Sequence, residues 1–170
     1  MSRLFPRPAY AEDQPYAHTI LTLHVLSRGF SVGAGVGSAI FLARRLLSRQ
    51  PSPSSLLRGA GSGSLIGAGL LALALAGRMR GRDDIEWRDR SWRLLWNRGQ
   101  AEVDEWWAAG AVLGGVGVGV LARNGVRGGA RLGFGSVLGG MGLGSLVGML
   151  GHAGWRYGVL GGFPGEERRL

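Results

Sequence analysis

The chain lacks two residue types altogether, and each absence removes a class of chemistry. It has no Cys, which excludes disulfides, zinc–thiolate sites and cysteine nucleophiles. It has no Lys either, because all 20 basic residues are Arg. Walker-type phosphate loops and Schiff-base enzymes are therefore excluded.

Charged residues are also scarce. They make up 18% of the 170 residues, below the roughly 25% of average proteins. Hydrophobic residues make up 45%, and the formal charge is +9. A soluble basic domain does not combine such charge with so apolar a composition, so we expect an anionic lipid partner and no nucleic acid.

The apolar residues lie in long uncharged blocks. Gly59 to Gly77 is a run of 19 residues, about 28 Å as a helix, against a hydrocarbon core of about 30 Å. Three further blocks have similar length and composition. We therefore predict an all-α integral membrane four-helix bundle with spans at about 18–47, 57–78, 104–122 and 131–155. The alternative is four buried helices of a soluble protein, but the chain has too few polar residues to surround them.

Polar segments flank this membrane domain of residues 18–155. Residues 1–17 form an N-terminal tail and residues 156–170 a C-terminal tail. The N-terminus has no apolar h-region, so we expect no secretory signal peptide.

Glycine is about three times as frequent as its usual share of roughly 7%. In every span glycines recur four residues apart and so share one helix face. Small residues at this spacing let membrane helices approach closely, which predicts a glycine-zipper bundle. The predicted packing residues are Gly29, Gly33, Gly37, Gly59, Gly63, Gly67, Gly110, Gly114, Gly115, Gly119, Gly135, Gly139, Gly140, Gly144 and Gly148.

The segment 83–99 between spans two and three is rich in Trp, Arg and acids. Its apolar residues fall on one side of a helix, which predicts an amphipathic helix at the membrane interface. The alternative is a solvated helix packed on a partner protein. Tryptophans there and at the span ends are predicted interfacial anchors, namely Trp87, Trp92, Trp96, Trp106, Trp107 and Trp155.

The short loops 44–58 and 123–131 carry Arg and no acid. Such loops favour the inner side of a membrane and anionic headgroups such as cardiolipin. The raw Arg count favours the opposite orientation, because the middle segment is long. The predicted headgroup ligands are Arg28, Arg44, Arg45, Arg49, Arg58, Arg123, Arg127 and Arg131.

Catalytic features are weak. His24 and Arg28 share a face of the first span, which fits either an interfacial pair or a path for protons, ions, a quinone or lipid. The middle acids have no accompanying histidine or metal pattern, and no strand precedes the glycine-rich loops. We expect no enzyme activity, no cofactor and no metal.

One stretch carries a resemblance. It starts at Asp104, continues through Gly110, Gly115 and Arg123, and includes the glycines from Gly133 to Gly148. The stretch resembles spans three and four of the mitochondrial inner-membrane translocase (TIM-channel) superfamily, which includes a four-helix accessory subunit of respiratory complex I. The middle segment is longer than the family's, and its Arg-to-Asp spacing after span two is not matched.

The resemblance implies a multi-pass protein of the mitochondrial inner membrane. With the short, dense Arg loops on the inner side, loops 44–58 and 123–131 lie in the matrix, and the termini and middle segment lie in the intermembrane space. We expect a non-catalytic structural accessory subunit of complex I, in contact with other membrane subunits and phospholipid. The alternatives are a subunit of a protein-import translocase and a small channel or transporter.

Overall fold

A computed structural model describes residues 5–48, 53–124 and 133–163 of the chain. Within these ranges the regular elements are helical and no strand occurs. In chain order they are η2 (Ala11–Asp13), α1 (Ala17–Ser48), α2 (Pro53–Met79), α3 (Asp84–Trp96), α4 (Arg98–Arg123), α5 (Phe134–Ala153) and η3 (Gly154–Val159).

Four of these helices are long and apolar enough to cross a membrane, as predicted. The candidate spans are Ala17–Leu47, Leu56–Met79, Arg98–Arg123 and Phe134–Val159. The third begins six residues before the predicted position 104, because Asn97 caps it by accepting a hydrogen bond from the Gln100 backbone N–H at 3.1 Å. The fourth continues past position 155 through the π-helical η3.

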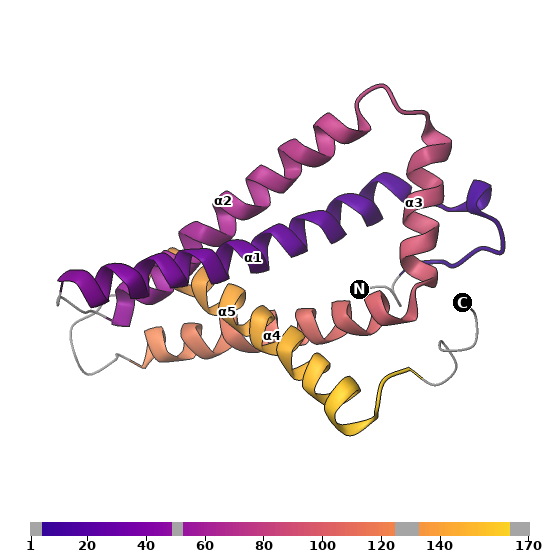
Figure 1. The fold of residues 1–170 in the computed structure, drawn as a ribbon. Helices are drawn as coiled ribbons and strands as arrows, with labels where there is room; N and C mark the ends of the chain where they lie inside the picture. The colour runs from indigo at the N-terminus through magenta and orange to yellow at the C-terminus, as the bar shows by residue number, and fades with distance from the viewer. Residues whose placement is uncertain (1–4, 49–52, 125–132, 164–170) are drawn as a thin grey trace.

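The helices form two antiparallel pairs (Figure 1). The N-terminal hairpin is α1 and α2, and the C-terminal hairpin is α4 and α5. The last turn of α1 and the first turn of α2 lie at the same end as the last turn of α4 and the first turn of α5 (Figure 1). α3 lies at the opposite end and runs across the other helices (Figure 1). Both connections predicted to share one side therefore leave from one end of the molecule.

Glycines hold the N-terminal hairpin together at backbone distance. A Cβ added to Gly33 would lie under 3.0 Å from the carbonyl oxygen of Gly63, and one on Gly37 would meet that of Gly59. Gly29 and Gly67 form a third such level. A residue with a side chain at these levels would force the two helices apart.

The C-terminal hairpin repeats this contact and adds another. A Cβ on Gly110 would meet the carbonyl of Gly144, and one on Gly114 would meet that of Gly140. On its other side α5 approaches α2, where a Cβ on Gly139 would meet the carbonyl of Leu57. α5 is thus the central helix.

Three predicted packing positions differ from this pattern. A Cβ on Gly119 would have no heavy atom within 4 Å, so Gly119 makes no helix contact in the described part of the chain. Gly115 faces the flexible side chain of Met141 rather than backbone. Gly135 packs through its carbonyl oxygen, which a Cβ added to Gly61 would meet. Gly61 was not among the predicted packing residues.

The two hairpins share one sequence register. Adding 81 to the residue number carries Gly29, Gly33, Gly59, Gly63 and Gly67 onto Gly110, Gly114, Gly140, Gly144 and Gly148. The segment Gly-Ser-Gly-Ser-Leu-Ile-Gly at 61–67 corresponds in the same way to Gly-Leu-Gly-Ser-Leu-Val-Gly at 142–148. The hairpin is therefore an internal repeat, which the sequence prediction missed because it treated each span separately.

α3 is the helix of the middle segment. Its predicted apolar side is divided, because Leu95 is buried whereas Ile85 and Trp96 are exposed. Trp92 donates a hydrogen bond to the Pro8 carbonyl at 3.0 Å, and Trp87 stacks on His18 with ring centroids 4.2 Å apart. Trp96 also donates to the Pro8 carbonyl, at 3.4 Å. All three predicted anchors on α3 thus bind it to the N-terminal segment or to the start of α1.

Candidate functional site

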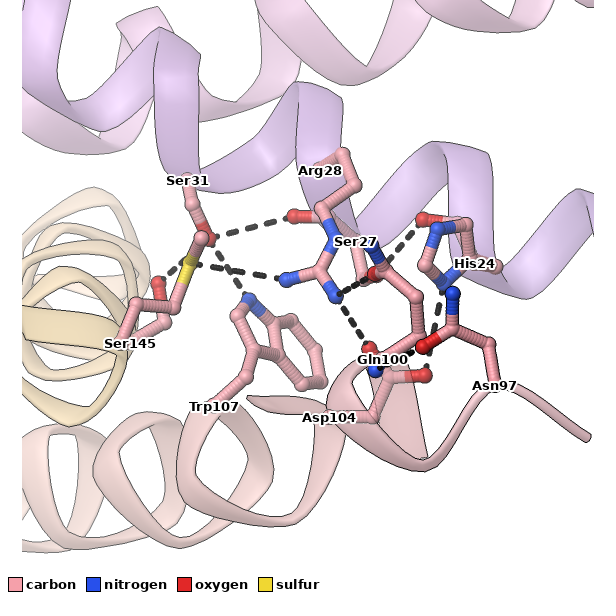
Figure 2. Close-up of polar contacts among 10 residues, drawn as sticks. His24, Ser27, Arg28, Ser31, Asn97, Gln100, Asp104, Trp107 and Ser145 are labelled. Atoms are coloured by element: carbon pink, nitrogen blue, oxygen red, sulfur yellow. Dashed lines mark hydrogen bonds and ion pairs between the residues drawn. The ribbon is translucent and has the colours of Figure 1, made fainter. Parts of the chain in front are cut away.

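Polar side chains join the two hairpins near the α3 end of the molecule. On α1 they occur at positions 24, 28 and 31, and on α4 at positions 100, 104 and 107. Each set has the spacing i, i+4, i+7, which places its members on one helix face. The two sets face each other across α1 and α4 (Figure 2). We call these six residues together with Ser145 the polar layer.

An ion pair forms the centre of the polar layer. Nη2 of Arg28 donates to Oδ1 of Asp104 at 2.6 Å and to Oε1 of Gln100 at 3.1 Å. Nδ1 of His24 lies 3.3 Å from the other Asp104 oxygen. The side chains of Arg28 and Asp104 are 19% and 11% exposed. A charge-assisted bond of this length offsets part of the cost of removing both charges from water.

A chain of hydrogen bonds extends the layer to α5 (Figure 2). Nε1 of Trp107 donates to Oγ of Ser31 at 2.6 Å, and this oxygen lies 2.8 Å from Oγ of Ser145. Ser145 in turn donates to the Gly142 carbonyl at 2.7 Å. Each hydroxyl proton is then used once if Ser31 donates to Ser145. Three helices are therefore linked through side chains with no solvent exposure at either serine.

A second cluster joins the start of α4 to the end of α5. Glu102 accepts two hydrogen bonds from Arg156, one of them from Nε at 3.0 Å. His152 Nε2 lies 3.4 Å from a Glu102 carboxylate oxygen, and Nε of Arg98 donates to the Glu102 carboxylate at 3.2 Å. The Arg156 guanidinium also lies 4.0 Å from the centroid of the Phe163 ring, a cation–π contact. Arg156 is 7% exposed and lies in the π-helical turn η3, a type of turn that is frequent at functional sites.

Both clusters are closed ion-pair networks. Asp104 and Glu102 are each contacted by Arg and His. Within the ranges that the structure covers, no group of three or more His, Cys, Asp or Glu could hold a metal ion. The two clusters neutralise charges between helices, because the carboxylate of each faces a guanidinium.

The structure gives three predicted site residues new surroundings. Arg28, a predicted headgroup ligand, pairs with Asp104. Trp107, a predicted anchor, donates to α1 inside the molecule, and Trp106 lies edge-on to His152 at 6.2 Å. The other anchor outside α3, Trp155, is half exposed.

Four of the remaining predicted headgroup ligands lie at the opposite end from α3. Arg44 and Arg45 end α1, Arg58 lies near the start of α2, and Arg123 ends α4. All four are exposed. Arg49, Arg127 and Arg131 lie outside the described residues. On α1 itself, Arg44 is separated from Arg28 by about half of the length of the helix.

The acidic half of the site was missed by sequence reasoning. Glu102 was left outside the third span and Asp104 was placed at its first residue, because that span was expected to begin at 104. The signal that would have found the role of Asp104 is the i, i+4, i+7 spacing at 100, 104 and 107, which matches that at 24, 28 and 31. Such matched polar faces on two apolar helices predict a paired contact.

The comparisons with known proteins identify a family. A family model described as "Protein of unknown function (DUF1757)" matches residues 9–150, and the chain belongs to that family. No curated protein matches the chain, and no solved structure matches it. The matched residues contain the Arg28–Asp104 pair, whereas His152 and Arg156 lie beyond them.

Proposed function

We propose that this chain is a non-catalytic structural subunit of a larger membrane assembly. The observation that carries the proposal is the polar layer, whose ionisable groups pair with each other inside the chain. In transporters and pumps such groups instead line a pathway for ions or substrate. Here the charges fasten helices together.

The glycine contacts support a glycine-zipper membrane bundle. Helices in lipid gain little from the hydrophobic effect, so close backbone approach supplies their association. Each hairpin has such an approach at several successive levels, and α5 approaches both α4 and α2. A bundle of this kind is a rigid body that neighbours can pack against.

The outward surface supports the role of a subunit. Only 17% of the candidate spans in α2 and in α4 is buried inside the chain. Large apolar side chains such as Leu73, Leu113 and Leu150 are more than two-thirds exposed. Lipid or helices of other subunits therefore cover most of the surface of these spans.

The specific assembly that we propose is respiratory complex I of the mitochondrial inner membrane, on the basis of the TIM-channel resemblance. In this arrangement α3 lies at the interface on the intermembrane-space side, and the arginines at the opposite end bind anionic headgroups on the matrix side. Arg28 is not part of this headgroup set, because Asp104 pairs with it.

Native-gel profiling of detergent-solubilised mitochondria tests the proposal. The tagged chain is followed by mass spectrometry across the gel. Comigration with a respiratory complex of near-megadalton size is the expected result. Comigration with the import machinery, or migration alone at low mass, would overturn it and favour the translocase or the channel respectively.

A matched pair of variants shows whether packing determines assembly. Gly114→Leu places a side chain against the Gly140 carbonyl, whereas Gly117→Leu projects into open space on the same helix. We expect Gly114→Leu to leave the large complex and Gly117→Leu to remain in it.

A further inference from the structure

The N-terminal hairpin has an open groove along its outer face. Its volume is about 580 Å³. The floor is formed by the glycines of the α1–α2 contact, and the rim by Val36, Ile40 and Ile66, which are about half exposed or more. Apart from Ser62 and Arg44, its lining is glycine or hydrophobic.

The groove has the length of one membrane leaflet. Its α1 wall extends from Val32 to Arg44, which is about 18 Å at 1.5 Å per residue. Half of the hydrocarbon core is about 15 Å. One end of the groove therefore lies at the interface and the other near the middle of the membrane.

The interfacial end of the groove is positively charged. Arg44 lines the groove itself, and Arg45 and Arg58 lie on the adjoining turns of α1 and α2. No Asp or Glu occurs between Asp13 and Asp83. The combination of an apolar channel and a basic end matches a phospholipid with an acyl chain below and an anionic headgroup above.

The internal repeat shows that the groove is particular to one hairpin. The counterpart of Ser62 at the groove wall is Leu143, and the counterpart of Gly37 on its floor is Val118. Val118 is buried against Gly140. The C-terminal hairpin thus has bulky side chains at two positions that the N-terminal hairpin keeps small.

We propose that this groove is a binding site for one anionic phospholipid, with an acyl chain along the glycine floor and the phosphate at Arg44. The inference rests on the membrane location in the proposed function. An acyl chain is narrow enough to lie inside the groove.

Native mass spectrometry of the purified full-length chain tests this site. The probes are dioleoyl phosphatidylglycerol and, as the uncharged comparison, dioleoyl phosphatidylcholine. We expect one phosphatidylglycerol to remain bound at detergent concentrations that remove phosphatidylcholine. Arg44→Ala should lower its affinity about fivefold, the effect of one basic contact near a membrane surface.

Two phenylalanine variants separate the groove from the rest of the surface. Ser62→Phe fills the groove, and we expect it to lower phosphatidylglycerol retention at least about fivefold. Leu65→Phe adds the same ring on α2 at an exposed position outside the groove lining, and retention should stay as in the wild type. If Ser62→Phe does not fold, Ser62→Leu copies the residue of the other hairpin and serves the same purpose.

Three results would overturn the site. They are equal retention of both lipids, equal loss in both phenylalanine variants, and a dimer that Ser62→Phe separates into monomers. The last would show a second copy in the groove. Lipid retention is measured on the isolated chain, so it is independent of whether the chain comigrates with a respiratory complex.

Discussion

The two hairpins have the same backbone contact but contribute opposite charges to the polar layer. Both place glycines four residues apart on each helix, and five of these coincide after a shift of 81 residues. At the polar layer they differ, because Arg28 corresponds to Ala109, and Asp104 corresponds to Leu23. The comparison teaches that glycine sets the geometry within a hairpin, whereas complementary charges connect one hairpin to the other.

Breaking the shared glycine contact should have a large effect in both hairpins. Gly33→Ala and its counterpart Gly114→Ala each place a methyl group against a backbone carbonyl. We expect each to destabilise the folded chain by about 1–3 kcal/mol, as overpacking does. Thermal unfolding in detergent, followed by circular dichroism, measures the change.

Gly69→Ala and Gly117→Ala are the matched controls, since a Cβ at either would have no heavy atom within 4 Å. They should be neutral or stabilise by up to about 1 kcal/mol through helix propensity. If Gly33→Ala destabilised the chain and Gly114→Ala did not, or the reverse, the two hairpins would not be equivalent.

Removing one charge of the polar layer should have an effect of similar size. Asp104→Leu leaves the Arg28 guanidinium without its carboxylate in a site that is largely buried. Breaking a buried pair in this way costs about 3 kcal/mol or more. Arg93→Ala removes the exposed Arg93–Asp89 pair of α3, and its effect on the melting temperature should be close to zero. Equal effects in the two variants would contradict the polar layer as the contact between hairpins.

Two serines at equivalent positions provide a finer test. Oγ of Ser145 is hydrogen-bonded to Oγ of Ser31 at 2.8 Å. Oγ of Ser64 is buried and has no hydrogen-bond partner among the described residues. Ser145→Ala should therefore destabilise the fold by about 1–2 kcal/mol, and Ser64→Ala should be neutral or stabilising. Melting temperatures of the two variants in the same detergent give the comparison. A larger loss of stability in Ser64→Ala than in Ser145→Ala would contradict the stabilising role of the Ser31–Ser145 hydrogen bond.

The smallest effect is expected outside the spans, at Asp84 on α3. Its hydrogen bond with His18 at 3.0 Å, and a second from Arg88 at 2.6 Å, hold the pKa of Asp84 below its usual value. The contact therefore stabilises the fold above the usual carboxyl pKa and stops doing so as the pH falls through the lowered pKa.

Asp84→Asn should consequently lower the melting temperature slightly at neutral pH and leave it unchanged in strong acid. Asp83→Asn makes the same charge change one residue earlier and should show no such pH dependence. A pH-independent effect of Asp84→Asn would show that the ion pair is not its cause.

The sequence predicted the four apolar helices, because length and hydropathy are local properties. It did not predict that α5 is central, since this depends on which glycine faces meet. It assigned Arg28 and Trp107 to the membrane interface by their usual preference. Their partners Asp104 and Ser31 are 76 residues away, so only the fold brings them together.

The most direct test of the account is a double-mutant cycle on the polar layer in the assembled complex. Arg28→Leu, Asp104→Leu and the double variant are followed by native gel. If the pair is a structural contact, either single variant leaves the large complex, and the double variant returns to it, because no unpaired charge remains. A double variant that is as defective as Asp104→Leu alone would contradict a structural role and indicate that the charges themselves are needed.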